Sequence, residues 1–111
     1  MEPRPPHAYQ DFIQRYPKIG QAWELIADAG KDGALDDHTC RLLKLAVAVG
    51  AQKEGAVRAN VRKALAMGIP IAEIEQTIAI AAGTVGLPGT VAVFTWIKDV
   101  LEHSAPPEPQ A

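Results

Sequence analysis

The sequence has one cysteine, six aromatic residues and no apolar run of the roughly 18 residues that span a membrane. Because the lone Cys40 excludes an intramolecular disulfide, it favours a reducing compartment, and we expect a cytoplasmic protein. The few aromatic residues mean that any core must be mainly aliphatic. The net charge of −2 lacks the basic excess that neutralises phosphates, so general nucleic-acid binding is not expected.

Chain length and proline placement predict a single domain. The 111 residues fit the common size of one domain, and no internal linker divides them. Three prolines lie in residues 1–7 and three more in residues 105–111. We therefore expect a flexible N-terminal tail over 1–7, one helical domain over 8–104, and a disordered tail over 105–111.

The hydrophobic pattern predicts an all-α protein of five or six helices. No segment alternates apolar and polar residues for long enough to form a strand. Proline, glycine and capping residues set the expected boundaries. The first four expected helices cover 8–16, 17–30, a segment from an Asp36 cap to about residue 49, and a segment between Gly55 and Gly68. The last two cover 71–84 and 90–103, and we expect Pro88 to break the chain between them.

Two helices carry patterns that bear on packing. Ile19, Trp23 and Ile26 repeat at helical spacing and give the second helix one apolar stripe. We expect Trp23, like Trp96, to belong to the core rather than to form a ligand platform. In the third helix nearly every residue of 42–49 is apolar, so we expect it to be buried on all sides and to contribute subunit contacts.

Three short motifs follow the third helix: Lys53-Glu54-Gly55, then Arg58 with Val61-Arg62, then Gly86-Leu87-Pro88. Together with the helices of residues 34–101, they resemble the carboxymuconolactone decarboxylase family, which includes the alkylhydroperoxidases. The resemblance implies an α-helical bundle that assembles into trimers or hexamers.

The same resemblance marks residues that this chain lacks. Peroxidase members carry a C-x-x-C motif and a histidine where this chain has Lys53, Ala56 and Asn60, and a relay glutamate near Arg41. Decarboxylase members also carry the histidine. Since disulfide exchange needs two thiols and an asparagine amide exchanges no proton near neutral pH, peroxiredoxin activity is doubtful.

The start of the fourth helix holds the candidate site. Within eleven residues the sequence has four cationic side chains and a single acid, Glu54. The cations are Lys53, Arg58, Arg62 and Lys63. They form either a solvated face with intrahelical pairs or an anion pocket. In the pocket interpretation Arg58, Asn60 and Arg62 bind the ligand, and Glu54 is the catalytic acid–base candidate. Helical spacing predicts that Asn60 faces the core side and Arg62 the outer side, with Glu54 undecided.

Two hypotheses for function follow. The first is an enzyme or pseudo-enzyme that acts on, or binds, a small carboxylate or lactone. The second is a non-catalytic small-molecule-binding or scaffold homo-oligomer. We expect no cofactor and no metal site, because no histidine–carboxylate set has ligand spacing. We interpret Cys40 as a small apolar residue beneath the third-helix cap, and His38 as exposed and solvated.

Overall fold

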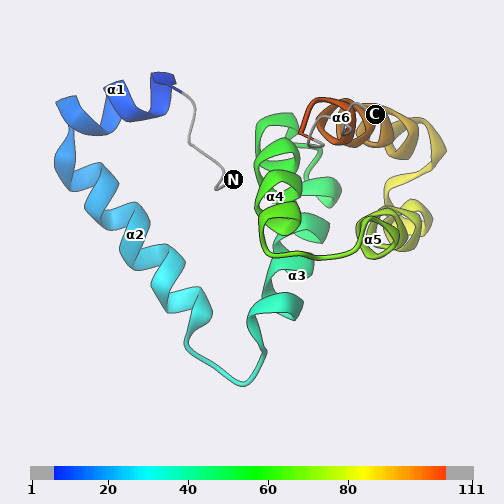
Figure 1. The fold of residues 1–111 in the computed structure, drawn as a ribbon, viewed down its shortest axis with the longest axis horizontal. Helices are drawn as coiled ribbons and strands as arrows, with labels where there is room; N and C mark the ends of the chain where they lie inside the picture. The colour runs from blue at the N-terminus through cyan, green and yellow to red at the C-terminus, as the bar shows by residue number, and fades with distance from the viewer. Residues whose placement is uncertain (1–6, 105–111) are drawn as a thin grey trace, which may run out of the picture.

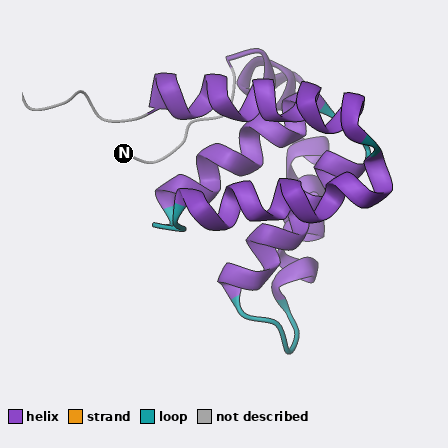
Figure 2. Cartoon of the chain, turned by 90° about the vertical axis from the view of Figure 1, so that its right-hand side faces the viewer, coloured by secondary structure: helices purple, strands orange, loops and turns teal. Residues whose placement is uncertain are grey.

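The computed structural model describes residues 7–104, which form six helices joined by short loops (Figures 1 and 2). Within that range no strand occurs, and the all-α prediction is confirmed. The expected tails fall outside the described residues, except that His7 begins the first helix. The helices are α1 (His7–Arg15), α2 (Pro17–Lys31), α3 (Asp37–Gly50), α4 (Glu54–Ala66), α5 (Ile71–Val85) and α6 (Leu87–Ser104).

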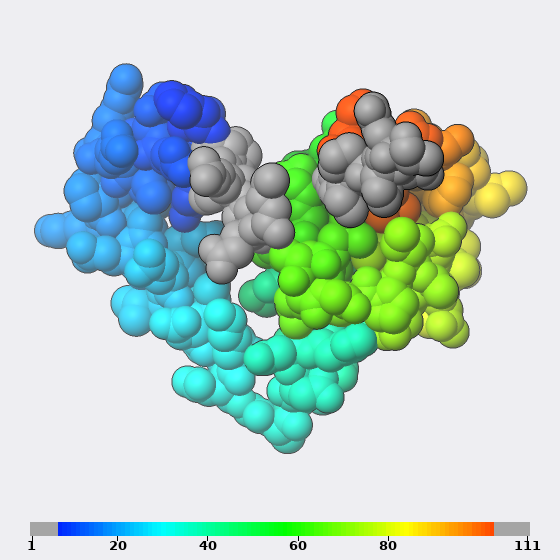
Figure 3. All heavy atoms as spheres, viewed as in Figure 1, coloured from blue at the N-terminus to red at the C-terminus, as the bar shows by residue number. Residues whose placement is uncertain are grey.

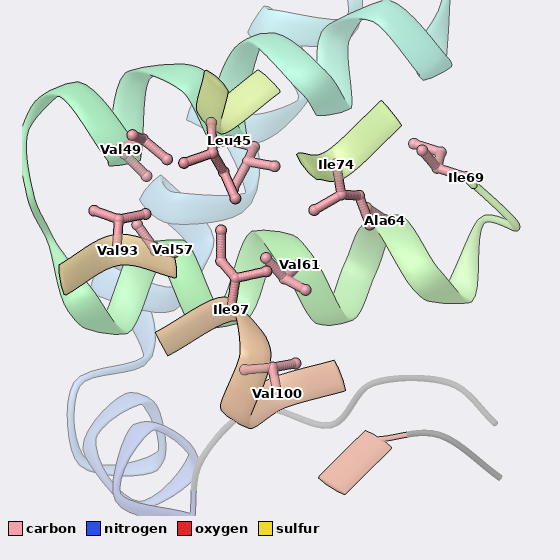
Figure 4. Packing of buried hydrophobic residues seen from close by; sticks show 12 residues of the cluster. Leu45, Val49, Val57, Val61, Ala64, Ile69, Ile74, Val93, Ile97 and Val100 are labelled. Atoms are coloured by element: carbon pink, nitrogen blue, oxygen red, sulfur yellow. The ribbon is translucent and has the colours of Figure 1, made fainter. Parts of the chain in front are cut away.

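Helices α3 to α6 form the body of the molecule around an aliphatic core (Figure 4). Helix α3 packs against α4 and α5, and α6 packs against the same two helices. The valine and isoleucine residues of α4 and α6 that are buried recur at helical spacing and form the inward faces of these two helices. The core residues are Leu45, Ala48, Val49, Val57, Val61, Ala64, Ile69, Ile74, Ile78, Val93, Ile97 and Val100.

Local signals explain most of the helix ends. Asp36 caps α3 as predicted, because its side chain accepts a hydrogen bond from the Thr39 backbone N–H at 2.7 Å. The link between α5 and α6 differs from the prediction. Pro88 does not break the chain there but lies in the first turn of α6, where its missing N–H costs no helical hydrogen bond. Gly86, with a φ of +90°, makes the whole link.

Helices α1 and α2 form an arm (residues 7–31) that projects from the body (Figure 1). The arm contacts the body near the loop that joins α2 to α3. Gly20 is the only buried residue of α2, and it is covered by Ile13 of α1 rather than by the body. The core assignment of Trp23 is therefore wrong for a single chain: the residue is 57% exposed, whereas Trp96 packs against the core.

One side of α3 also lies on the surface of the chain. Leu45, Ala48 and Val49 are buried, but Leu43 is 48% and Val47 is 71% exposed. The expectation that α3 is buried on all sides fails within one chain, because the arm leaves this side uncovered. None of the helices in residues 7–104 combines the length and the apolar character that a membrane span requires.

Candidate functional site

The structure divides the four predicted site residues between two faces of α4. Glu54 and Arg58 face α6: the Arg58 guanidinium contacts Glu54 at 3.0 Å and Asp99 at 2.5 Å. Arg62 lies four residues beyond Arg58, half-buried, and pairs with no carboxylate in the described part of the chain. Glu54 and Arg58 thus belong to an ion-pair network, in agreement with the intrahelical-pair interpretation.

Asn60 lies on the opposite face of α4, toward α3. Its side-chain oxygen accepts a hydrogen bond from Arg41 Nη1 at 2.8 Å, and its amide nitrogen donates to the Ala56 carbonyl at 2.9 Å. Asn60 therefore faces α3, and the hypothesis that it shares one cavity with Glu54 and Arg58 receives no support from this geometry. Its partner is instead Arg41, a residue on another helix.

A cavity of about 200 Å³ lies beside Arg41, where the end of α2, the start of α3 and the end of α4 meet. It contains three cationic side chains and one carboxylate. We call it the cation pocket. Its lining residues are Gly30, Lys31, Asp37, Cys40, Arg41, Lys44 and Met67.

Arg41 is the partly buried cation of this pocket. Its one side-chain partner among residues 7–104 is the neutral Asn60 amide, and its Nε is buried without any partner. Burial lowers the pKa of the Arg41 guanidinium, since desolvation disfavours the charged form. A partly buried charge normally has a counter-ion, and among the described residues Arg41 has no carboxylate partner.

Further positive charge surrounds Arg41. Burial is the main cause that lowers the pKa of Lys63, and the next causes are the positive charges of its neighbours. These neighbours are Arg41, Lys44, Lys31 and Arg62. Like charges that lie close together repel one another. An anion that enters the pocket would therefore reduce several of these repulsions together.

The remaining candidates have structural partners. The Cys40 thiol lines the cation pocket but also lies 3.7 Å from the Leu35 carbonyl, to which it donates, as expected for a residue beneath the cap. His38 is not simply solvated, because its Nε2 lies 2.6 Å from Glu73 of α5. In residues 7–104 no three histidine, cysteine or acidic residues lie close enough together to hold a metal ion.

Sequence reasoning missed the cation pocket because its charges come from different helices. Lys31 ends α2, while Arg41 and Lys44 lie on α3. A signal was present nevertheless: Arg41 and Lys44 are three residues apart and therefore share a face of a helix that is otherwise mainly apolar after its first turn. Two cations on one side of such a helix indicate a polar site rather than a core.

The network on the other face of α4 predicts a titration behaviour. His103 Nδ1 donates a hydrogen bond to the Asp99 backbone carbonyl at 2.7 Å and lies 3.1 Å from the Asp99 carboxylate. The backbone hydrogen bond and then the carboxylate charge raise the pKa of His103 above 6.5. The stability that His103 contributes is therefore fully present below pH 6.5 and is lost as the pH rises through the raised pKa.

We expect Asp99→Asn to lower the His103 pKa, because the carboxylate charge is removed while the backbone hydrogen bond stays. The pKa is measured by NMR titration of the histidine ring protons. Glu102→Gln is the control, since Glu102 is only a minor cause of the shift, and it should change the pKa less. An unchanged His103 pKa in Asp99→Asn would contradict the pairing.

Comparison with known proteins gives one result. The sequence model of the carboxymuconolactone decarboxylase family matches residues 17–99, from the start of α2 into α6. No curated protein and no solved structure matches the chain. The match covers most of the chain and includes helix α2, which lies outside the range over which the motifs alone indicated a resemblance.

Proposed function

Because the chain belongs to the carboxymuconolactone decarboxylase family, we propose that it binds a small organic carboxylate or lactone acid in the cation pocket, without thiol or histidine chemistry. The observation that carries the proposal is Arg41: a partly buried guanidinium in a cavity, with a neutral amide as its side-chain partner. Guanidinium groups bind carboxylates through charge-assisted hydrogen bonds, so a ligand carboxylate supplies the missing counter-ion.

The composition of the pocket favours a small dianion. Lys31 and Lys44 provide two further positive charges, and Asp37 is the only acid in the lining. A volume of about 200 Å³ holds an organic acid of a few carbon atoms. Met67 and the stem of Arg41 offer apolar contacts for its chain. One carboxylate of the ligand would pair with Arg41. Its second carboxylate, or a lactone carbonyl oxygen, would pair with a lysine of the pocket.

Binding without catalysis is the form of the proposal that this geometry favours. Glu54, the acid–base candidate, is paired with Arg58 and is not part of the pocket lining. The position that carries a histidine in related proteins holds Asn60, whose amide is engaged by Arg41 and by the Ala56 carbonyl. Neither group is free to move a proton at the bound acid.

We expect isothermal calorimetry with succinate to give measurable binding to the wild-type protein and at least tenfold weaker binding to Arg41→Met. Methionine keeps much of the packing of the arginine stem while removing the charge. The matched control is Arg58→Met, which removes a cation from the same molecule outside the pocket and should bind like wild type. Succinamide, which has the same length but no charge, should not bind.

Two results would contradict the proposal. The first is an equal affinity of the Arg41→Met and Arg58→Met proteins for succinate. The second is the absence of heat with wild type for succinate and for lactone acids of similar size. Circular dichroism of each variant ensures that a loss of affinity reflects the missing charge and not unfolding.

A scaffold homo-oligomer is the second candidate function. The exposed Leu43 and Val47 on α3 favour it, because a single chain leaves this apolar side uncovered. The family resemblance implies a trimer or a hexamer for such an assembly. In either function we propose a cytoplasmic location, where the thiol of Cys40 would stay reduced.

A further inference from the structure

The cation pocket lies at the junction of the arm and the body, so both parts of the molecule line it. Gly30 and Lys31, at the end of α2, form the arm side of the pocket. The other lining residues are Met67, which follows α4, and four residues of α3. The width of the pocket therefore depends on the angle between α2 and α3.

The loop that joins α2 to α3 leaves this angle weakly fixed. It covers residues 32–36, and no atom lies within 4 Å of the place where a side chain at Gly33 would begin. Among the described residues, no backbone hydrogen bond joins 32–34 to the body, and no ion pair joins the arm to the body. A loop with so few contacts can change its backbone angles at little cost, as a hinge requires.

The side of α2 that faces the body is apolar and uncovered. Gly30 lines the pocket and therefore points toward α3. Ile26, Trp23 and Ile19 precede Gly30 by four, seven and eleven residues, so they lie on the same side of the helix. Each of the three is about half exposed or more. Figure 1 shows α2 diverging from α3 above the loop, and Figure 3 shows the surface hollowed between the two.

The facing side of α3 has matching positions at the same distances from the pocket. Lys44 and Val47 follow the pocket residue Cys40 by four and seven residues, and Val47 is 71% exposed. At 1.5 Å per residue, Ile26 and Lys44 both lie about 6 Å along their helices from the pocket. Trp23 and Val47 both lie about 10 Å from it. An antiparallel pairing of α2 with α3 therefore brings apolar surface against apolar surface.

Positive charge opposes this pairing. Lys31 on the arm shares the pocket with Arg41 and Lys44 of the body, and Asp37 is the only acid in the lining. The charge of Lys31 is also one of the causes that lower the pKa of Lys63 on α4, so the arm cation is close enough to interact with those of the body. Bringing α2 toward α3 without an anion increases this repulsion.

We propose that the arm is a lid for the cation pocket, held open by repulsion between Lys31 and the cations of the body and closed by a bound dicarboxylate. The inference rests on the proposed function, since the dicarboxylate is the ligand proposed for the pocket. Its two charges offset the repulsion that keeps α2 from α3. In the closed state Trp23 packs on Val47, Ile26 packs on the stem of Lys44, and α2 covers the bound acid.

The chain's own body is the occupant that fits the apolar side of α2. The register described above matches α2 to α3 of the same chain. The short loop also keeps the two surfaces together at an effective concentration on the order of millimolar, far above that of a separate partner in solution. Closure therefore needs no second molecule except the anion.

Tryptophan fluorescence tests the closure, because the sequence has only two tryptophans. In Trp96→Phe the remaining Trp23 is 57% exposed in the open state. Saturating succinate should shift its emission to shorter wavelength and lower its acrylamide quenching constant at least twofold. The control is Trp23→Phe, whose Trp96 packs against the core and should not respond. Unchanged Trp23 quenching at a succinate concentration that calorimetry shows to be saturating overturns the lid and leaves the proposed function intact.

A charge variant tests the lid without any ligand. On the Trp96→Phe background, Lys31→Gln/Lys44→Gln removes the repulsion and should lower Trp23 quenching at least twofold in the absence of succinate. The matched control, Lys18→Gln/Lys53→Gln, removes two exposed cations outside the pocket and should leave the arm open. Equal quenching in the two variants overturns the proposal, whether or not succinate binds.

Disulfide trapping identifies the surface that the arm covers. On a Cys40→Ser background with succinate present, oxidised Trp23→Cys/Val47→Cys should form a bond within one chain, so its mass stays near 11.9 kDa on a non-reducing gel. Trp23→Cys/Val91→Cys is the control, because Val91 is exposed on α6, away from the hinge, and should form no such bond. The absence of the internal bond from the first variant, or a bond between two chains in its place, overturns the proposal.

Discussion

Leu45→Ala is expected to lower the free energy of unfolding by about 3–5 kcal/mol, the range for a leucine removed from a rigid core. Leu45 is fully buried on α3 and belongs to an aliphatic cluster to which α4, α5 and α6 also contribute (Figure 4). Other members of this cluster, among them Val61, Ile74 and Ile97, belong to different helices and cannot all move to fill the space. The free energy of unfolding of a domain of this size is about 5–15 kcal/mol, so this one substitution removes a large part of the stability.

The measurement is urea denaturation at one fixed protein concentration, because association also changes apparent stability. Leu43→Ala is the matched control: it makes the same chemical change two residues earlier on the same helix, at a side chain that is 48% exposed. It should cost about 1 kcal/mol or less in a single chain. Equal losses for the two variants would mean that Leu45 is not the central core residue that its burial implies.

Asn60→Leu is expected to lower the free energy of unfolding by about 2–3 kcal/mol. The change removes the side-chain oxygen that accepts from Arg41 Nη1 and leaves a partly buried cation without any side-chain partner in the described chain. Leucine keeps the number and the branching of the side-chain heavy atoms of asparagine, so the shape of the side chain changes less than its hydrogen bonding. Urea denaturation measures the effect.

Asn60→Asp is the informative counterpart, because it adds the counter-ion that Arg41 lacks. The introduced carboxylate pairs with Arg41 but loses the amide donor to the Ala56 carbonyl, so stability should change by about 1 kcal/mol or less, while succinate binding should weaken at least tenfold. Since Arg41 lowers the pKa of that carboxylate, its contribution is present above the unfolded value of about 3.9 and is lost as the pH falls through the lowered value. Succinate affinity equal to wild type would show that the ligand does not need the unpaired charge.

The body of the fold could be predicted because its signals are local. The Asp36 cap, the glycines after α4 and α5, and the valine and isoleucine spacing of α4 and α6 all act over a few residues. The start of α6 was misplaced for a related reason. Pro88 is compatible both with a chain break and with a first helical turn, and only the close connection of α5 to α6 through Gly86 selects the second.

The arm and the site could not be predicted in the same way. An apolar stripe containing Trp23 has the same pattern whether it faces its own core or another molecule, so periodicity alone assigns it to the core. At the site, the pocket interpretation grouped Asn60 with Arg58 because they are close in the sequence. Residues that are two positions apart in a helix, however, point in directions about 200° apart. The partner that Asn60 has is Arg41, nineteen positions away, and that pairing depends on how α3 crosses α4.

The order of helix contacts in the body has a consequence for how the chain folds. Each helix of the body packs on its neighbour in sequence or on the next but one, as α3 does on α4 and α5, and α4 on α6. Such local topologies fold quickly, within microseconds to milliseconds, because little chain must be closed before contacts form. The arm contacts this unit mainly at the α2–α3 junction. The body should therefore collapse first, and the arm should be ordered against it in a later step.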